Sequence, residues 1–129
     1  MKRDMNLIRQ ILFALEHRPE HKASLDLHID GCDRILIRYQ LLLLAQAGLV
    51  DFEPEVVDSG RIARVYVFGL TWNGHEFLDA IRSEEIWAGI RDCAEEVGTL
   101  PFELIQAQGL RLLKRAARKS RQVDRRPLA

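Results

Sequence analysis

Residues 41–50 read LLLLAQAGLV, and they join the end of a predicted helix to the start of a predicted strand. The leucines continue an apolar helical pattern that begins near Asp33, and Gly48 stands where a helix commonly ends in a left-handed residue. Leu49 and Val50 then begin an extended segment. A helix that passes through a glycine into a strand in this way is typical of the helix before the wing of a winged-helix domain.

Two shorter segments precede this stretch. Residues 4–17 carry apolar side chains at helical spacing behind a capping Asp4, and Pro19 ends the pattern. Residues 23–29 alternate apolar and polar side chains, as a short half-buried strand does, and a turn signal follows them. Together they predict a helix and a strand, in the order that a winged helix requires.

A β-hairpin and three helices follow the same stretch. Residues 49–70 hold two extended runs around a polar loop that contains Asp58-Ser59-Gly60. The expected helices cover residues 72–82, residues 84–97 and a segment from Pro101 to near Ser120. This order predicts an α+β fold, namely a winged helix extended by C-terminal helices.

The chain has 129 residues, enough for one domain with one core. We expect a winged-helix domain over residues 1–82 and a helical extension over residues 83–119. The extension either packs on that domain or forms a dimer face. A basic tail over residues 120–129 is expected to be disordered.

The formal net charge of zero hides an asymmetry along the chain. Residues 1–110 hold 11 Lys/Arg and 18 Asp/Glu, a net charge of −7, whereas residues 111–129 hold 8 Lys/Arg and a single acid, a net charge of +7. Neutralisation of phosphates by Lys and Arg is the main source of sequence-independent affinity for nucleic acid. The basic end of the chain is therefore relevant to any nucleic-acid partner.

The stretch LTWNGHEFLDAIRSEEIW, residues 70–87, contains a His75-Glu76 pair that could indicate a metal site. A zinc-protease helix needs a second histidine four residues after the first, but Asp79 stands there and no later histidine exists. The sequence also lacks a nucleophile elbow and a Gly-rich phosphate loop. No catalytic, cofactor-binding or metal-binding residue is expected, and the protein is interpreted as non-enzymatic without a small-molecule substrate.

The same stretch has a structural interpretation. Thr71 is a helix cap, and Gly74 would let the start of the helix approach the sheet closely. We expect Trp72, Phe77 and Trp87 to lie in the core.

Cys32 and Cys93 stand far apart without a Cys-x-x-Cys partner, as free thiols of a reducing compartment do. No apolar run reaches the ~18 residues that a membrane span needs. The start of the chain does not resemble a signal peptide. A cytoplasmic protein with no membrane partner is expected.

DNA binding is the first functional hypothesis. The helix before the wing would present side chains to the major groove, the wing would contact the backbone, and the basic tail would track phosphates. Because the hairpin also carries acidic residues, the helix and the wing offer little net positive charge for contact with nucleic acid. The predicted nucleic-acid contacts are Arg34, Arg38, Gln40, Arg61, Arg64, Arg118, Lys119 and Arg121.

The alternative hypothesis is a protein-interaction or adaptor module that does not read DNA. The C-terminal helices carry more apolar residues than a minimal winged helix needs, so some of them form either core or a homodimer face. The predicted dimer residues are Trp87, Ile90, Phe102, Ile105 and Leu113. An acidic body with a basic tail could also pair head to tail with a second copy.

Four segments (MKRDMNLIRQIL, LLAQAGLV, LTWNGHEFLDAIRSEEIW and GTLPFELI) resemble, in order and spacing, the bacterial and prophage family catalogued as domain of unknown function 2513. The resemblance covers roughly residues 1–115. It implies a winged-helix-like fold and a phage or mobile-element context, and no reaction. The chain departs from the family pattern at Cys32, where an aromatic residue is commoner, and in its Arg-rich end.

Overall fold

The structure is a computed structural model that describes residues 2–18, 24–25, 27–98 and 100–124. Over these residues the chain is α+β, with five helices and one three-stranded antiparallel sheet, which confirms the predicted class. It divides into two compact units, Met1–Leu78 and Asp79–Ala129. Each unit is described by itself below.

Helices α1 (Met5–Glu16) and α2 (Arg34–Gln46) begin at the aspartates that the sequence indicated. The carboxylate of Asp4 accepts a hydrogen bond from the Leu7 N–H at 3.1 Å, and that of Asp33 accepts one from the Ile35 N–H at 3.0 Å. Each satisfies a backbone donor that a helix leaves without an intrahelical partner. Gly48 has a φ of +76° just after α2, as expected for a left-handed residue at a helix end.

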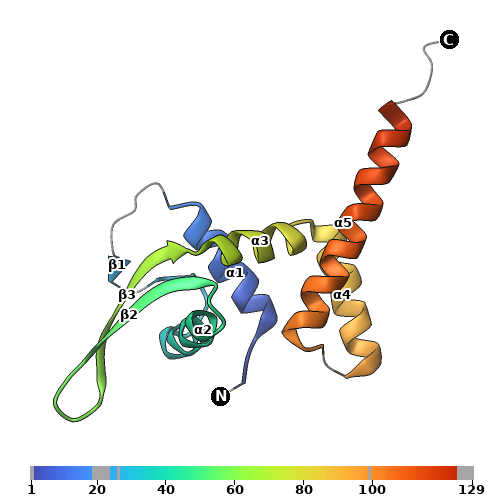
Figure 1. Cartoon of the computed structure of the whole chain (residues 1–129). Helices are drawn as coiled ribbons and strands as arrows, with labels where there is room; N and C mark the ends of the chain where they lie inside the picture. Colours follow the sequence, from blue (N-terminus) through green and yellow to red (C-terminus); the bar gives the residue numbers. More distant parts are fainter. Residues whose placement is uncertain (1, 19–23, 26, 99, 125–129) are drawn as a thin grey trace. The chain divides into compact units, whose positions relative to one another are not determined.

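The sheet has the order β1-β3-β2 (Figure 1), with β1 at Ser24–Leu25, β2 at Val50–Val56 and β3 at Ile62–Leu70. The hairpin of β2 and β3 is confirmed. Strand β1 is shorter than the predicted segment 23–29, of which residues 23 and 26 lie outside the described residues. Residues 27–29 leave the strand because they lead into a turn, closed by the Cys32 N–H donating to the Ile29 carbonyl oxygen at 3.1 Å.

The core of the first unit lies between the sheet and helices α1 and α2, which contact β3 and β2 respectively. Arg18, just after α1, donates from Nη2 to the carbonyl oxygen of Val67 at 3.1 Å and so ties this end of the helix to β3. The fully buried side chains of this core include Ile11, Leu12, Ile37, Leu41, Leu44 and Val67.

Helix α3 (Trp72–Ile81) begins against the turn that links α2 to β2. The Thr71 N–H donates to the Leu49 carbonyl oxygen at 3.0 Å, and the Thr71 hydroxyl donates to the Gly48 carbonyl oxygen at 2.6 Å. The same hydroxyl oxygen accepts from the Gly74 N–H at 3.0 Å, which confirms Thr71 as the cap. A Cβ atom at position 74 would overlap the Leu49 carbonyl oxygen, so the close approach predicted for Gly74 is also confirmed.

The expectation that Trp72 enters the core is wrong, because 78% of its surface is exposed. The buried positions of α3 include Gly74, Phe77 and Ile81, which share one face at helical spacing. At ~100° per residue, Trp72 lies about 180° from Ile81 and therefore on the opposite side of the helix. Phe77 and Trp87 are buried, as predicted.

The second unit contains α4 (Glu84–Val97) and α5 (Phe102–Asp124), which contact each other. The Ser83 hydroxyl accepts from the Ile86 N–H at 3.3 Å and caps α4, whose predicted start at residue 84 is confirmed. Helix α5 continues through Asp124, so residues 120–124 are helical and the disordered tail predicted from residue 120 is wrong for them. Residues 125–129 of that tail lie outside the described residues. Within the described part of the chain, no helix is both long and apolar enough to cross a bilayer.

Candidate nucleic-acid interface

The three predicted contacts on α2 have different environments. Arg34 is exposed and Arg38 is half-buried, whereas Gln40 is fully buried with 0% exposure. The Gln40 side chain accepts from the Asp4 N–H at 2.9 Å through Oε1 and donates to the Lys2 carbonyl oxygen at 2.9 Å through Nε2. Gln40 therefore holds the segment before α1 against α2, and the prediction that it contacts nucleic acid is wrong.

The hairpin places its two predicted arginines among carboxylates. Arg61 and Arg64 are exposed, but Arg64 lies directly opposite Glu55 in the register of β2 and β3. The acidic residues of the hairpin and its loop (Asp51, Glu53, Glu55 and Asp58) are all exposed. Because four carboxylates accompany two guanidinium groups, the hairpin does not present a net positive surface to phosphates.

Helix α5 gathers the basic residues of the chain's end into one stripe. The spacing of three, four and seven residues places most of these side chains within about 160° of the helix circumference. Residues 104–123 contain no Asp or Glu, so nothing on these turns offsets the stripe. We call the exposed residues Arg111, Lys114, Arg115, Arg118, Lys119 and Arg121 the α5 basic stripe.

All members of the stripe except Arg111 follow Leu112 on α5. Helix α4 has 14 residues and α5 has 23, so at ~1.5 Å per residue α5 is about 13 Å longer. The contact between them reaches Leu112, whose Cδ1 would lie 3.7 Å from a Cβ at Gly89. Every residue from Leu113 to Arg121 is exposed. This end of α5 is therefore accessible from most directions.

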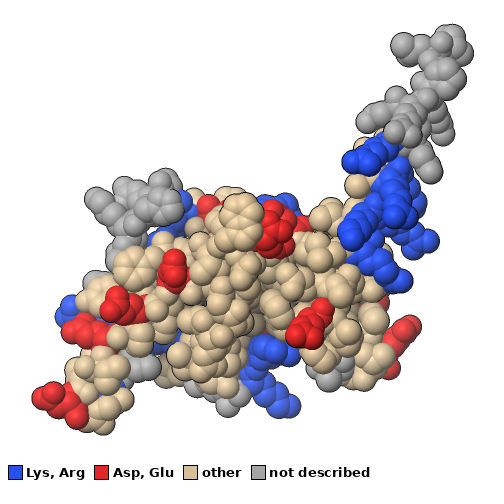
Figure 2. All heavy atoms as spheres, viewed as in Figure 1, with Lys and Arg blue, Asp and Glu red and all other residues tan. Residues whose placement is uncertain are grey.

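The stripe also borders a shallow depression of about 320 Å³, lined by Arg111, Leu112, Lys114, Arg115 and Arg118. In Figure 2 Lys and Arg atoms gather along this end of α5, and no Asp or Glu atoms are visible among them. Four basic side chains around a hollow on one helix suit an extended polyanion, because each cation can neutralise a separate phosphate.

Arg118, Lys119 and Arg121 of the stripe are among the predicted nucleic-acid contacts, whereas Arg111, Lys114 and Arg115 were counted only in the basic end of the chain. The helix predicted from Pro101 to near Ser120 already covers these positions, and the structure extends it through Asp124, so that Arg121 joins the same helix.

The predicted dimer residues are mostly internal. Trp87, Ile90 and Ile105 are buried within the chain, which corrects their assignment to a dimer face. Of the two predicted possibilities, core or homodimer face, these three residues form core, because they lie on the inward faces of α4 and α5. Phe102 is half-buried, and Leu113 is 39% exposed.

His75 and Glu76 of α3 are both exposed. Among the residues that the structure describes, no three His, Cys, Asp or Glu side chains are grouped as ligands of one metal ion. Cys32 and Cys93 are both half-buried free thiols.

Comparison with known proteins identifies relatives but no described activity. Residues 2–100 match the model of a family described as "Hypothetical protein (DUF2513)". A protein of Haemophilus influenzae named "Uncharacterized protein" is 36% identical over 94 residues, which cover 70% of this chain and 76% of that protein. No solved structure matches the chain. The family match ends before α5, so the α5 basic stripe lies outside the matched residues.

Proposed function

The chain belongs to the family of hypothetical proteins designated DUF2513, and from this premise we propose that it is a non-enzymatic, DNA-binding winged-helix protein whose phosphate contacts lie on α5. A regulatory role on DNA, in a phage or mobile-element context, is part of this proposal. The α5 basic stripe is the observation that carries this proposal.

The topology of the first unit supports the winged-helix assignment. Helix α1, strand β1, helix α2 and the hairpin of β2 and β3 follow one another, with the first strand paired to the last. In such a domain α2 enters the major groove and the hairpin is the wing. The segment between Leu27 and Asp33 is short, so this domain would carry one helix fewer than a complete helix-turn-helix unit.

The charges determine which part of the molecule contributes affinity. The α5 basic stripe supplies six cations on one accessible helix, whereas the hairpin carries more carboxylates than arginines. With Gln40 buried, the remaining candidates for base contact on α2 are Arg34 and Arg38. We therefore expect strong dependence on salt and modest preference for sequence.

A salt titration of DNA binding tests the proposal. The full chain and a chain truncated after Ala117 are titrated with a fluorescent duplex at several salt concentrations. Truncation removes Arg118, Lys119 and Arg121 and two further arginines. The logarithm of the binding constant should fall steeply with the logarithm of salt for the full chain, and the slope should decrease by about 3 to 4 on truncation.

Absence of binding by both chains at low salt would contradict the proposal. If truncation leaves the salt-dependence slope unchanged, the removed end of α5 does not contribute phosphate contacts. Circular dichroism of both chains provides the control, because the truncated chain should retain the signal of α1 to α4.

A protein-interaction function is the second candidate, supported by the exposed apolar residues of the first unit. Trp72 is 78% exposed and Ile35, in the first turn of α2, is 61% exposed. Exposed tryptophans are frequent binding hot spots. Substitution of both by serine should leave salt-dependent DNA binding intact if the first proposal holds. If the protein-interaction proposal holds, the same double substitution should abolish binding of a protein partner.

A further inference from the structure

One face of the β-hairpin is exposed and carries a row of carboxylates beside aromatic rings. Residues directly opposite each other in antiparallel strands point to the same face. Phe52 is paired with Val67, which is fully buried, so both point to the inner face of the sheet. Glu53 is paired with Tyr66, and both point to the opposite, outer face. We call the side chains of Asp51, Glu53, Glu55, Arg64, Tyr66 and Phe68 the outer hairpin face.

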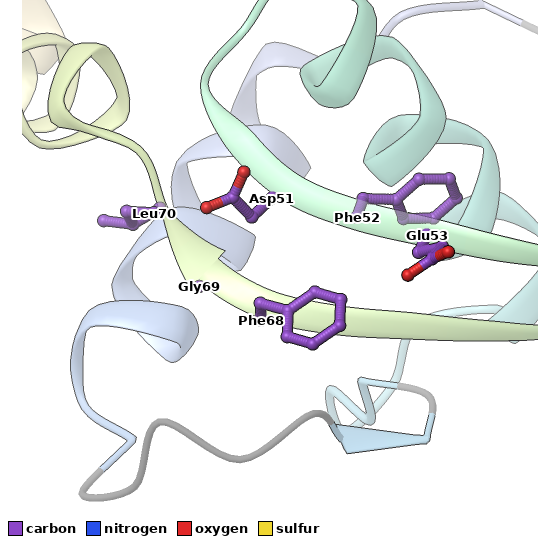
Figure 3. Close-up of a pocket in the computed structure, with 6 residues that line it drawn as sticks. All are labelled: Asp51, Phe52, Glu53, Phe68, Gly69 and Leu70. Atoms are coloured by element: carbon purple, nitrogen blue, oxygen red, sulfur yellow. The ribbon is translucent and has the colours of Figure 1, made fainter.

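This face is open and partly apolar. Phe68 is 39% exposed, and the sheet order leaves β2 at the edge. A depression of about 530 Å³ is lined by Asp51, Phe52, Glu53, Phe68, Gly69 and Leu70. Figure 3 shows Phe68 from β3 near Glu53 from β2, with Asp51 farther along β2. An aromatic ring bordered by carboxylates suits an Arg or Lys side chain, which can lie over the ring while its charge is neutralised.

We propose that the outer hairpin face binds the α5 basic stripe of a second copy of this chain. The chain carries both complementary surfaces, one with Asp51 and Glu53 and one with six exposed cations. The spacings also agree. Alternate residues of a strand are ~6.6 Å apart, and residues four apart on a helix rise ~6 Å, so cations four apart, such as Arg111 and Arg115, can face successive carboxylates.

The centre of this interface is the end of the hairpin nearest α3. Glu55 lies opposite Arg64 and also accepts a hydrogen bond from the Tyr66 hydroxyl at 3.2 Å, so its charge is partly satisfied within the chain. Asp51 and Glu53 face Gly69 and Tyr66, which carry no charge. These two carboxylates are therefore the main anionic partners of the incoming helix.

This association uses the same α5 basic stripe that the proposed function assigns to DNA, but it does not depend on that function. A stripe that lies on the outer hairpin face of another copy cannot contact phosphates. Self-association and DNA binding would then exclude each other wherever both occur.

Sedimentation of the full chain without DNA tests the proposal. At about 0.05 M salt the mean mass should rise with protein concentration above 14.9 kDa, and at about 0.5 M salt it should return to that of one chain, because exposed charges are screened. Asp51→Lys/Glu53→Lys and Arg115→Glu/Arg118→Glu should each remain single at low salt. Glu95→Lys/Glu96→Lys on α4 changes the net charge by the same amount as the hairpin variant and should associate like the unmodified chain.

A mixture of the hairpin variant (Asp51→Lys/Glu53→Lys) with the α5 variant (Arg115→Glu/Arg118→Glu) distinguishes a specific contact from general repulsion. The lysines of one variant then face the glutamates of the other, while the unmodified surfaces also face each other. The mixture should form a 1:1 complex although each variant alone is single. Failure of the mixture to associate, or equal loss of association in the α4 variant, would overturn the proposal.

DNA binding of the same variants separates the two proposals. Asp51→Lys/Glu53→Lys should bind DNA at least as well as the unmodified chain, whereas Arg115→Glu/Arg118→Glu should lose at least tenfold in affinity at low salt. If the DNA affinities differ from these expectations while the two variants associate when mixed, the proposed function alone is refuted. If the DNA affinities are as expected but the two variants do not associate when mixed, this inference alone is refuted.

Discussion

The carbonyl oxygen of Leu49 occupies the place that a Cβ atom at Gly74 would need. The same oxygen accepts the Thr71 N–H at 3.0 Å, so it is held in position by the cap of α3. This arrangement joins the turn after α2, the start of β2 and the first turn of α3. It explains why a glycine is required inside a helix, where glycine normally lowers stability.

We predict that Gly74→Ala destabilises the protein by about 1 to 3 kcal/mol, because the added methyl group meets backbone that cannot rotate away. The free energy of unfolding in urea is the measurement. Gly89→Ala is the matched control, since its Cβ would lie 3.7 Å from Leu112 Cδ1, in ordinary contact. The control should be neutral or stabilising by up to about 1 kcal/mol. Equal effects of the two substitutions would contradict the close approach.

Gln40→Met is expected to cost about 1 to 3 kcal/mol, because it leaves the Asp4 N–H and the Lys2 carbonyl without their side-chain partner. Thermal unfolding measures this loss. Gln46→Met on the exposed face of the same helix should have little effect. At a temperature where both variants are folded, their DNA affinities should agree with that of the unmodified chain. A selective loss of affinity in Gln40→Met would restore its predicted contact with bases.

The two tryptophans should respond in opposite ways to substitution by alanine. Trp87 is 4% exposed, so Trp87→Ala should cost about 3 to 5 kcal/mol through lost burial and the cavity left behind. Trp72→Ala should change stability by no more than about 0.5 kcal/mol. Urea unfolding followed by circular dichroism compares them. A large loss for Trp72→Ala would show that its ring packs against the chain.

Local signals predicted most of the fold. The caps at Asp4, Asp33 and Ser83 and the glycine after α2 act within a few residues, so the sequence placed those helix ends correctly. Alternation and a turn placed the hairpin. Strand β1 was overextended, because the turn at residues 29–32 competes with the alternating pattern.

The errors concern relationships that are distant in the sequence or depend on helix phase. Gln40 was assigned to DNA because its partners, Lys2 and Asp4, lie 38 and 36 residues away. Trp72 was assigned to the core because its hydrophobicity outweighed its position opposite the buried face of α3. The predicted contacts include only Arg118, Lys119 and Arg121 of the stripe, because Arg111, Lys114 and Arg115 enter the prediction only through the net charge of residues 111–129.

The central claim is that α5, and not the hairpin, carries the phosphate contacts. The most direct test compares the salt dependence of DNA binding for two variants that each remove two positive charges, Arg115→Gln/Arg118→Gln on α5 and Arg61→Gln/Arg64→Gln on the hairpin. We predict that the slope of the logarithm of the binding constant against the logarithm of salt decreases by about 2 for the α5 variant and stays unchanged for the hairpin variant. An unchanged slope for the α5 variant, or an equal or larger decrease for the hairpin variant, would contradict the claim.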